Sequence, residues 1–167
     1  MKPTFRVAAD LGEVFHEHRA ELVQLAAFIL GDRSTGEDVV QDVFVRVHQR
    51  GHPMDGDPLP YLRAAVVNGC RSVLRRRLVI RRHAERDSSP CPPLTAEEAA
   101  MLSEDRRRVL AALAALPPRR REVLVLRFYL ELSEAEIAAM LGISLGTVKS
   151  TTARGLTALA RTLKETS

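Results

Sequence analysis

The sequence contains no tryptophan and few aromatic residues of any kind, with five phenylalanines and two tyrosines in 167 residues. Because strands are enriched in aromatic and β-branched side chains, this scarcity disfavours a β-sandwich. Alanine, leucine and arginine are abundant instead, and all three are good helix formers. The composition therefore predicts an all-α protein, and the chain is long enough for one core or two small ones.

Cysteine is also scarce. Cys70 and Cys91 provide neither a disulfide framework nor a metal-ligand spacing, which fits a reducing compartment. His48 and His52 are four residues apart, but the glycine between them interrupts any shared helix, so we expect no metal and no other cofactor. No Ser-His-Asp or Cys-His constellation is recognisable, and we expect no catalytic residue.

Long apolar runs are absent too. No stretch approaches the roughly 20 residues that a membrane-spanning helix needs, and no apolar segment follows a basic start at the N-terminus. We therefore expect no membrane insertion, no signal peptide and a cytoplasmic location.

The charges are distributed unevenly. The formal net charge is +4, but residues 32–42 are acidic whereas residues 71–86 are strongly basic. Surfaces of opposite sign indicate two different kinds of partner.

Three helices are expected in the N-terminal part of the chain. Apolar residues recur at helical spacing over residues 10–30. A capping box of Ser34 with Glu37 predicts a second helix that runs to about residue 50. Asp57 followed by Pro58 predicts the start of a third helix, with the aspartate as its cap and the proline in its first turn. The second helix has an apolar stripe of Val39, Val40, Val43, Phe44 and Val47.

A proline-rich segment divides the chain. Residues 87–94, D-S-S-P-C-P-P-L, predict a flexible linker. The linker separates an N-terminal domain of residues 1–86 from a C-terminal domain of residues 95–167. In the second domain we expect a capped helix over residues 95–116, a helix over residues 119–130 and two more helices, which together make a four-helix unit.

The last two helices have the pattern of a helix-turn-helix. Ser133 with Glu136 forms a capping box that begins the first. Gly142 ends it in a left-handed conformation, and Val148 fills the gap between the two helices. The outward face of the second helix presents Thr147, Lys149, Ser150, Thr151, Thr152 and Arg154. These hydroxyls and cations suit phosphates and base edges, so the pattern predicts DNA binding. The alternative is an ordinary helical hairpin with a solvated polar face.

Arginines gather near the end of the third expected helix. Residues three and four apart share a helical face, so several of them can form one stripe that tracks phosphates. These are Arg71, Arg75, Arg82 and Arg86. A soluble helix end is the alternative, but a solvated face normally mixes signs, and only Glu85 opposes the arginines here.

Acidic and amide residues cluster near the start of the second expected helix. They are Glu37, Asp38, Gln41 and Asp42. First-turn carboxylates complement the helix dipole, which explains part of the pattern. The dipole does not explain why acid and amide continue into the next turn beside valines. We therefore expect an exposed surface, half polar and half apolar, that docks another protein.

A second group of arginines, Arg119 to Arg121, follows two prolines at a helix start. The helix dipole disfavours cations there. Either a DNA phosphate or solvent compensates them, and the sequence leaves both interpretations open.

Taken together, these segments resemble a bacterial RNA polymerase sigma factor of the extracytoplasmic-function group, in particular the actinobacterial members with two domains. Residues 36–47, G-E-D-V-V-Q-D-V-F-V-R-V, resemble the core-binding helix of sigma region 2. Residues 60–77 resemble the part of region 2 that opens and reads the −10 element, and residues 116–160 resemble region 4, which reads the −35 element. The resemblance covers nearly the whole chain outside the linker.

The resemblance implies a specificity subunit that has no catalysis of its own and directs promoter-specific transcription initiation. The implied partners are core RNA polymerase, through the clamp of its largest subunit and its flap, and promoter DNA, both duplex and melted. An anti-sigma protein is a further implied partner. The implied core-binding residues are Glu37, Asp38, Gln41 and Asp42. Those for the −10 element are Asn68, Arg71, Ser72, Arg75 and Arg76. Those for the −35 element are Thr147, Lys149, Ser150, Thr151 and Arg154.

The sequence departs from the family pattern in three places. Many relatives have an acidic residue at the position of Ser72, an arginine at that of Thr151 and a tryptophan near His48. Among the few aromatic residues, Tyr61 and Phe44 are candidates for stacking on unpaired bases. We expect base capture to depend more on hydrogen bonds than on stacking.

Two other functional classes compete with the sigma factor. A conventional helix-turn-helix regulator would bind duplex operators without polymerase, usually as a symmetric dimer. Its N-terminal domain would sense a ligand or dimerise, and neither task needs a basic helix beside an acidic docking helix. An enzyme that acts on nucleic acid is the third class, and the lack of a visible metal or acid-base constellation argues against it.

Overall fold

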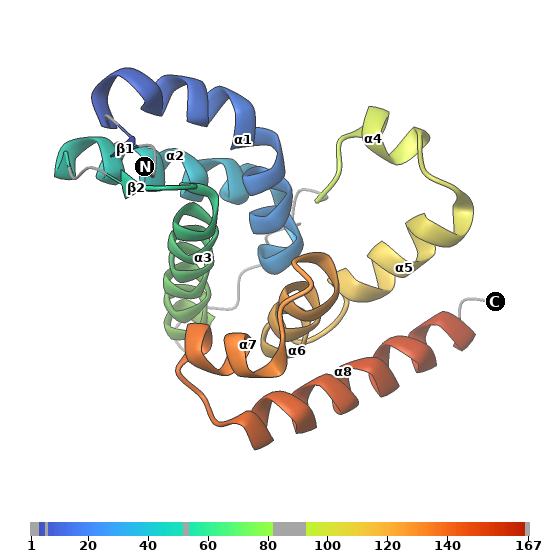
Figure 1. Ribbon diagram of the computed structural model, residues 1–167. Helices are drawn as coiled ribbons and strands as arrows, with labels where there is room; N and C mark the ends of the chain where they lie inside the picture. Colours follow the sequence, from blue (N-terminus) through green and yellow to red (C-terminus); the bar gives the residue numbers. More distant parts are fainter. Residues whose placement is uncertain (1–3, 6, 52–53, 82–92, 166–167) are drawn as a thin grey trace. The chain divides into compact units, whose positions relative to one another are not determined.

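The computed structural model describes residues 4–5, 7–51, 54–81 and 93–165 (Figure 1). They belong to two compact units, Met1–Pro93 and Leu94–Ser167. Both units are helical, which confirms the all-α class. The described residues contain one exception, a pair of two-residue strands in the first unit. The predicted linker lies almost entirely outside the described residues.

The first unit contains three long helices that pack on one another (Figure 1). They are α1 (Val7–Leu30), α2 (Arg33–Arg50) and α3 (Leu59–Arg81). Strand β1 (Thr4–Phe5) pairs antiparallel with β2 (Met54–Asp55), just before α3. The three predicted helices are confirmed. The backbone N–H of Leu59 donates to the Asp57 carboxylate at 2.9 Å, as expected for an aspartate before a helix start.

The core of this unit is formed by the facing apolar stripes of the helices. The apolar stripe predicted for α2 is buried throughout. Phe44 packs edge-on against Phe15 of α1, with ring centroids 4.5 Å apart. Because Phe44 belongs to the core, its ring is not available to stack on unpaired bases. Tyr61, the other candidate for stacking, is 46% exposed.

The capping box predicted at Ser34 and Glu37 is wrong. Asp32 caps α2 instead, because its carboxylate accepts from the backbone N–H groups of Ser34 at 3.1 Å and Thr35 at 3.5 Å. Helix α2 therefore begins at Arg33, and Glu37 lies beyond the first turn. There its carboxylate pairs with Arg33 at 3.4 Å.

Arg77, in the arginine run of α3, points into the first unit. Its guanidinium donates to the backbone oxygen of Leu30 at 3.3 Å, to the Asp32 carboxylate at 3.2 Å and to the Thr35 hydroxyl at 3.0 Å. One side chain thus contacts the last turn of α1 and the cap of α2 together, and it provides a donor for a backbone oxygen at the end of α1. Arg77 therefore holds three helices together.

Replacing Arg77 with alanine is expected to lower the free energy of unfolding of the first unit by about 2 kcal/mol, because hydrogen bonds that involve charged groups contribute on the order of 1.5–3 kcal/mol. The neighbouring Arg76 is exposed, and Arg76→Ala is expected to change stability by less than about 0.5 kcal/mol. Urea unfolding followed by circular dichroism measures both. Equal effects of the two substitutions would contradict the structural role of Arg77.

The second unit contains five α-helices and one π-helical turn in its described residues. They are α4 (Ala96–Ala100), α5 (Glu104–Ala114), α6 (Pro118–Leu124), η1 (Val125–Tyr129), α7 (Glu134–Leu141) and α8 (Leu145–Glu165). The capping box of Thr95 with Glu98 is confirmed. The single helix expected over residues 95–116 is wrong, and so is the count of four helices. Ser103 begins a new helix, because its hydroxyl accepts from the backbone N–H of Arg106 at 3.4 Å.

The arginines at the start of α6 contact the protein itself. Arg121 is buried and donates to the backbone oxygens of Ala114 at 2.8 Å and Leu116 at 3.3 Å, at the end of α5. Arg119 pairs at 3.0 Å with Glu122, which is only 2% exposed. Neither DNA phosphate nor solvent is therefore needed to compensate these two cations.

Helix η1 interrupts the regular helix that α6 begins. The backbone N–H of Leu130 donates five residues back to Val125 at 3.2 Å, the spacing that defines a π-turn. Arg127 closes the segment by donating to the backbone oxygen of Leu132 at 3.0 Å. Phe128 and Tyr129 are exposed at its end.

Candidate DNA-binding and polymerase-binding surfaces

Helices α7 and α8 form the predicted helix-turn-helix. The Ser133–Glu136 capping box is present in both directions, at 2.7 and 3.2 Å. Hydrogen bonding by Ser133, through its hydroxyl and then its backbone N–H, holds the pKa of the Glu136 carboxyl below its usual value. Gly142 has φ of 63°, the left-handed conformation expected at this turn. Val148 is completely buried.

The first turn of α8 is ordered by its own hydroxyls. Ser144 accepts from the backbone N–H of Thr147 at 3.1 Å and exchanges a hydrogen bond with the Thr147 hydroxyl at 2.8 Å. Ser150 donates one turn later to the backbone oxygen of Thr147 at 3.2 Å. The hydroxyls that would meet DNA are therefore held against the helix before any ligand arrives.

The predicted −35 residues lie on two sides of α8. Four of them share a face, because Ser150 and Thr151 are each three or four residues from both Thr147 and Arg154. Lys149 lies away from this face and near α7, where its ammonium is 3.9 Å from the carboxylate of Glu134. The structure thus groups four of the five residues and places the fifth beside an acidic neighbour.

Close packing of α8 on α6 sets the position of this face. Gly155 is buried, and a Cβ atom built on it would be 3.1 Å from two side-chain atoms of Leu124. Such a distance is shorter than an ordinary carbon contact. Helix α8 therefore approaches α6 as closely as it does because residue 155 has no side chain.

The predicted −10 residues lie on the outer part of α3. Ser72 donates to the backbone oxygen of Asn68 at 3.1 Å, and Arg75 donates to the Ser72 hydroxyl at 3.3 Å. These three residues form one face, and Arg71 lies beside it at the same helical spacing. Arg76 is exposed and lies further around the helix. The stripe predicted to continue through Arg82 and Arg86 lies outside the described residues.

The predicted core-binding residues lie on α2. Asp38, Gln41 and Asp42 are exposed and share the face opposite the core. Glu37 lies to one side, half-buried against Arg33.

The apolar half of this surface was predicted wrongly. The valines expected beside the acids are buried, because they form the side of α2 that packs into the core. The exposed apolar residue is instead Val45, which is 48% exposed and lies one turn beyond Gln41 and Asp42. The spacing of three and four residues from these two could have identified it.

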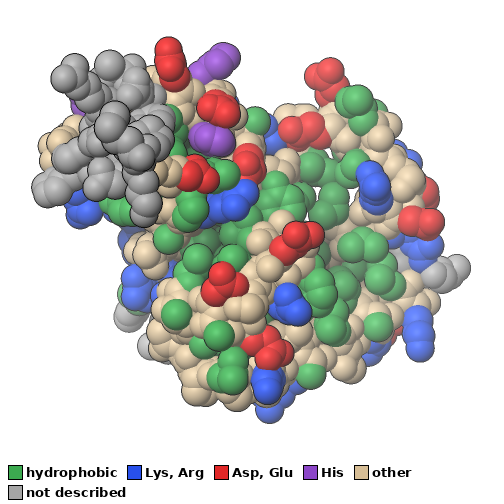
Figure 2. Space-filling view, viewed as in Figure 1, with side chains coloured by type: hydrophobic (Ala, Val, Ile, Leu, Met, Phe, Trp, Pro, Cys, Tyr) green, Lys and Arg blue, Asp and Glu red, His purple; other side chains and the backbone are tan. Residues whose placement is uncertain are grey.

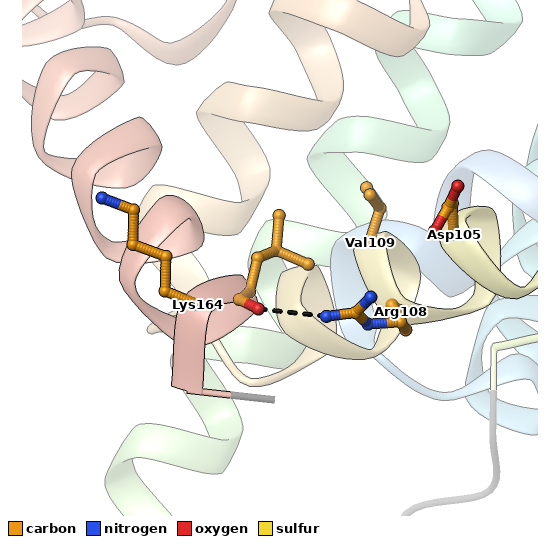
Figure 3. A pocket seen from close by; sticks show the side chains of 5 residues that line it. Asp105, Arg108, Val109 and Lys164 are labelled. Atoms are coloured by element: carbon orange, nitrogen blue, oxygen red, sulfur yellow. Dashed lines mark hydrogen bonds between the residues drawn. The ribbon is translucent and has the colours of Figure 1, made fainter. Parts of the chain in front are cut away.

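An open hollow of about 300 Å³ lies between α5 and the end of α8 (Figure 3). Arg108 ties the two helices there, because its Nη2 donates to the backbone oxygen of Leu163 at 3.2 Å. The lining residues are Asp105, Arg108, Val109, Leu163 and Lys164. They include no nucleophile–base pair of the Ser-His or Cys-His kind.

Two features are absent from the described part of the chain. No group of three or more histidine, cysteine, aspartate or glutamate residues there could hold a metal ion. None of the helices there combines the length and the apolar character needed to cross a bilayer.

Both units match known families. Residues 14–78, in the first unit, match Sigma-70 region 2, and residues 100–159, in the second, match Sigma-70, region 4. The chain is therefore a sigma factor of the sigma-70 family. Its two-region organisation is that of the extracytoplasmic-function group, as the sequence resemblance implied. Members of this family are non-enzymatic initiation factors that bind core RNA polymerase and promoter DNA. A conventional helix-turn-helix regulator would not explain the region 2 match.

Two solved structures are similar over most of the chain. One is the sigma factor RpoE in complex with the anti-sigma factor NepR from Bartonella quintana. It is 23% identical with a TM-score of 0.69, over 93% of this chain and 97% of that one. The other is CnrH in complex with the cytosolic domain of CnrY. It is 25% identical with a TM-score of 0.60, over 94% of this chain and 89% of that one. No curated protein matches the sequence.

Proposed function

We propose that three separate helix faces divide the work of initiation. The acidic face of α2, with Asp38, Gln41 and Asp42, docks on the clamp of the largest polymerase subunit. The outer face of α3, with Asn68, Ser72 and Arg75 at its centre, holds the unwound −10 strand. The outer face of α8 enters the major groove of the −35 element, and the second unit also contacts the polymerase flap.

The sign and exposure of each face support this division, and the exposed acids of α2 are the observation that carries it. These acids neither cap α2 nor pack into the core, because Asp32 forms the cap and the valines of α2 fill the core. Charge that the fold does not use is free to complement a partner. The face of α3 has the opposite sign, and a cationic surface with hydrogen-bonding groups suits a single strand.

Glu37, Arg71 and Arg76 complete the proposed region 2 sites, at the margins of the two faces. Glu37 is half-buried beside Arg33, so its contribution to polymerase binding is smaller than that of Asp38. Tyr61 is exposed on α3 and supplies aromatic surface near the strand-binding face.

The proposed domains are residues 1–86 for region 2, residues 87–94 for a linker and residues 95–167 for region 4. The protein acts in the cytoplasm, where polymerase and promoters are found, and catalyses no reaction of its own. An anti-sigma protein is a further proposed partner, and the description of RpoE as a complex with the anti-sigma factor NepR supports this.

Addition of the purified full chain to bacterial core polymerase tests the proposal. We expect co-elution and start-site-specific transcription from a promoter library, which would also identify the −10 and −35 sequences. Tight binding to duplex DNA without co-elution would contradict the proposal. If the full chain neither co-elutes with polymerase nor binds duplex DNA, but the isolated units do bind, a contact within the full chain inhibits it.

Arg154→Ala is expected to weaken binding to the −35 duplex by about 1–3 kcal/mol if the guanidinium contacts a base. A loss that is uniform across sequences would instead indicate a phosphate contact. Arg161→Ala is the matched control, because Arg161 is exposed nearer the other end of α8, where it pairs with Glu165 at 4.0 Å. Equal effects of the two substitutions, measured by fluorescence anisotropy, would refute the placement of the −35 face.

A further inference from the structure

One of the five residues predicted to contact the −35 element, Lys149, lies on the side of α8 near α7 and has an acidic neighbour. Lys149 Nζ of α8 lies 3.9 Å from the Oε2 atom of Glu134, the first residue of α7. The two side chains are 59% and 36% exposed, so the pair is open to solvent. Figure 2 shows acidic and basic side chains next to one another over α7 and the N-terminal end of α8. Among the described residues, Arg154 forms no such ion pair.

Glu134 is not needed for the cap of α7. The cap of α7 is formed by Ser133 and Glu136, and Glu134 takes no part in it. An ion pair as exposed as this one adds little to stability. A carboxylate so close to a cation nevertheless matters when DNA approaches. A phosphate that binds Lys149 has to come near a second negative charge and displace it.

We propose that Glu134 limits the affinity of α8 for DNA phosphate by competing for Lys149. The inference rests on the proposed function of α8 and on the −35 contact that the family resemblance implies for Lys149. Non-specific binding depends almost wholly on phosphate contacts, which contain no sequence information. At a −35 site, Thr147, Ser150 and Arg154 hold the duplex in register and help to displace the carboxylate. Glu134 therefore weakens binding to arbitrary DNA more than binding to the −35 site, and so raises specificity.

The Glu134→Gln substitution in the full chain tests this directly. It is expected to tighten binding to a short mixed-sequence duplex by about twofold to fivefold at low salt, the range of an exposed ion pair. The gain shrinks as salt is raised, because exposed charges are screened. Fluorescence anisotropy measures both affinities. The ratio of affinity for the −35 duplex, identified from the promoter library, to that for the mixed duplex is expected to fall.

Two further variants make the test specific to the pair. Lys149→Ala is expected to weaken binding, and adding Glu134→Gln to it is expected to change nothing further, because the two residues act together. Glu165→Gln removes one negative charge at the far end of the same helix, beside Arg161. It is expected to leave affinity unchanged. Circular dichroism establishes that each variant is folded.

The outcomes separate this inference from the proposed function. An equal gain from Glu134→Gln with and without Lys149 would indicate a general charge effect and overturn the competition. A loss with Lys149→Ala but no gain with Glu134→Gln would overturn the role of Glu134 and leave the −35 surface in place. If neither Lys149→Ala nor Arg154→Ala weakens binding, the −35 assignment falls and the role of Glu134 falls with it. An unchanged affinity ratio would overturn the effect on specificity.

Discussion

Replacing Asp38 and Asp42 together with lysine is expected to lower the affinity for core polymerase by about a hundredfold, because like charges placed opposite each other across an interface cost several kcal/mol. Folding is expected to be unaffected, since both residues are exposed on the side of α2 away from the core. Co-elution with core polymerase and titration of the labelled variant measure the loss.

The matched control for this variant lies on α1. Glu13 and Glu17 are also exposed and also four residues apart on one helix. Replacing both with lysine changes the net charge equally but leaves α2 intact, so polymerase affinity is expected to stay close to that of the unmodified chain. An equal loss in both double variants would indicate that total charge, and not the α2 face, determines polymerase binding.

Gly36→Val is expected to destabilise the first unit by about 3 kcal/mol or more, as expected when side-chain atoms are forced into a packed core. A Cβ atom at this position would lie 3.0 Å from the backbone nitrogen of Ala27 and 3.3 Å from the Cβ of Ala26. The backbone of α1 cannot give way as a flexible side chain could, so α2 would have to move away from α1. Chemical unfolding measures the change.

Gly12→Val distinguishes this packing effect from the general effect of removing a helical glycine. Gly12 is exposed in α1, and nothing lies within 4 Å of a Cβ built on it. Since glycine is a poor helix former, this variant is expected to be as stable as the unmodified chain or slightly more stable. A similar loss in both variants would contradict the close approach of α2 to α1.

Local signals in the sequence predicted local structure well. The capping boxes at Ser133 and Thr95 depend on residues three apart, and both are confirmed. The left-handed glycine at position 142 depends only on its own backbone. The apolar stripe of α2 depends on helical periodicity alone. Each of these can be evaluated within a few residues of sequence.

The predictions that proved wrong depended on contacts between residues far apart in the sequence. The Ser34 capping box had a correct pattern, but Asp32 is the better acceptor, and Arg77 supports it from more than forty residues along the chain. Arg77 and Arg121 each belong to a run that suggested DNA contacts. Both turn inward because backbone oxygens at helix ends lie within their reach. A run of like residues does not indicate which of its members face solvent.

The candidate sites show the same division. The family resemblance grouped Asn68, Ser72 and Arg75, and hydrogen bonds join these three residues along α3. The pattern of the second helix of the helix-turn-helix placed Lys149 on the same outward face as Thr147, Ser150, Thr151 and Arg154, whereas Lys149 lies near α7. Helical spacing could also have shown that the valines of α2 lie on the side opposite its acids and face the core. It could not show that Lys149 lies beside Glu134, which depends on the angle between α7 and α8.

The π-helical turn of η1 fixes the number of residues that this segment must contain. Such a turn has one residue more than a regular turn, so Val125–Tyr129 amounts to a single-residue insertion within one helix. Deleting one residue there would let a regular helix continue and would rotate everything that follows by about 100° around its axis. Ile137 and Leu141 would then leave the core. The fold therefore accommodates substitutions of the exposed residues of this segment more easily than deletions. A relative that lacks one residue here is expected to orient its helix-turn-helix differently.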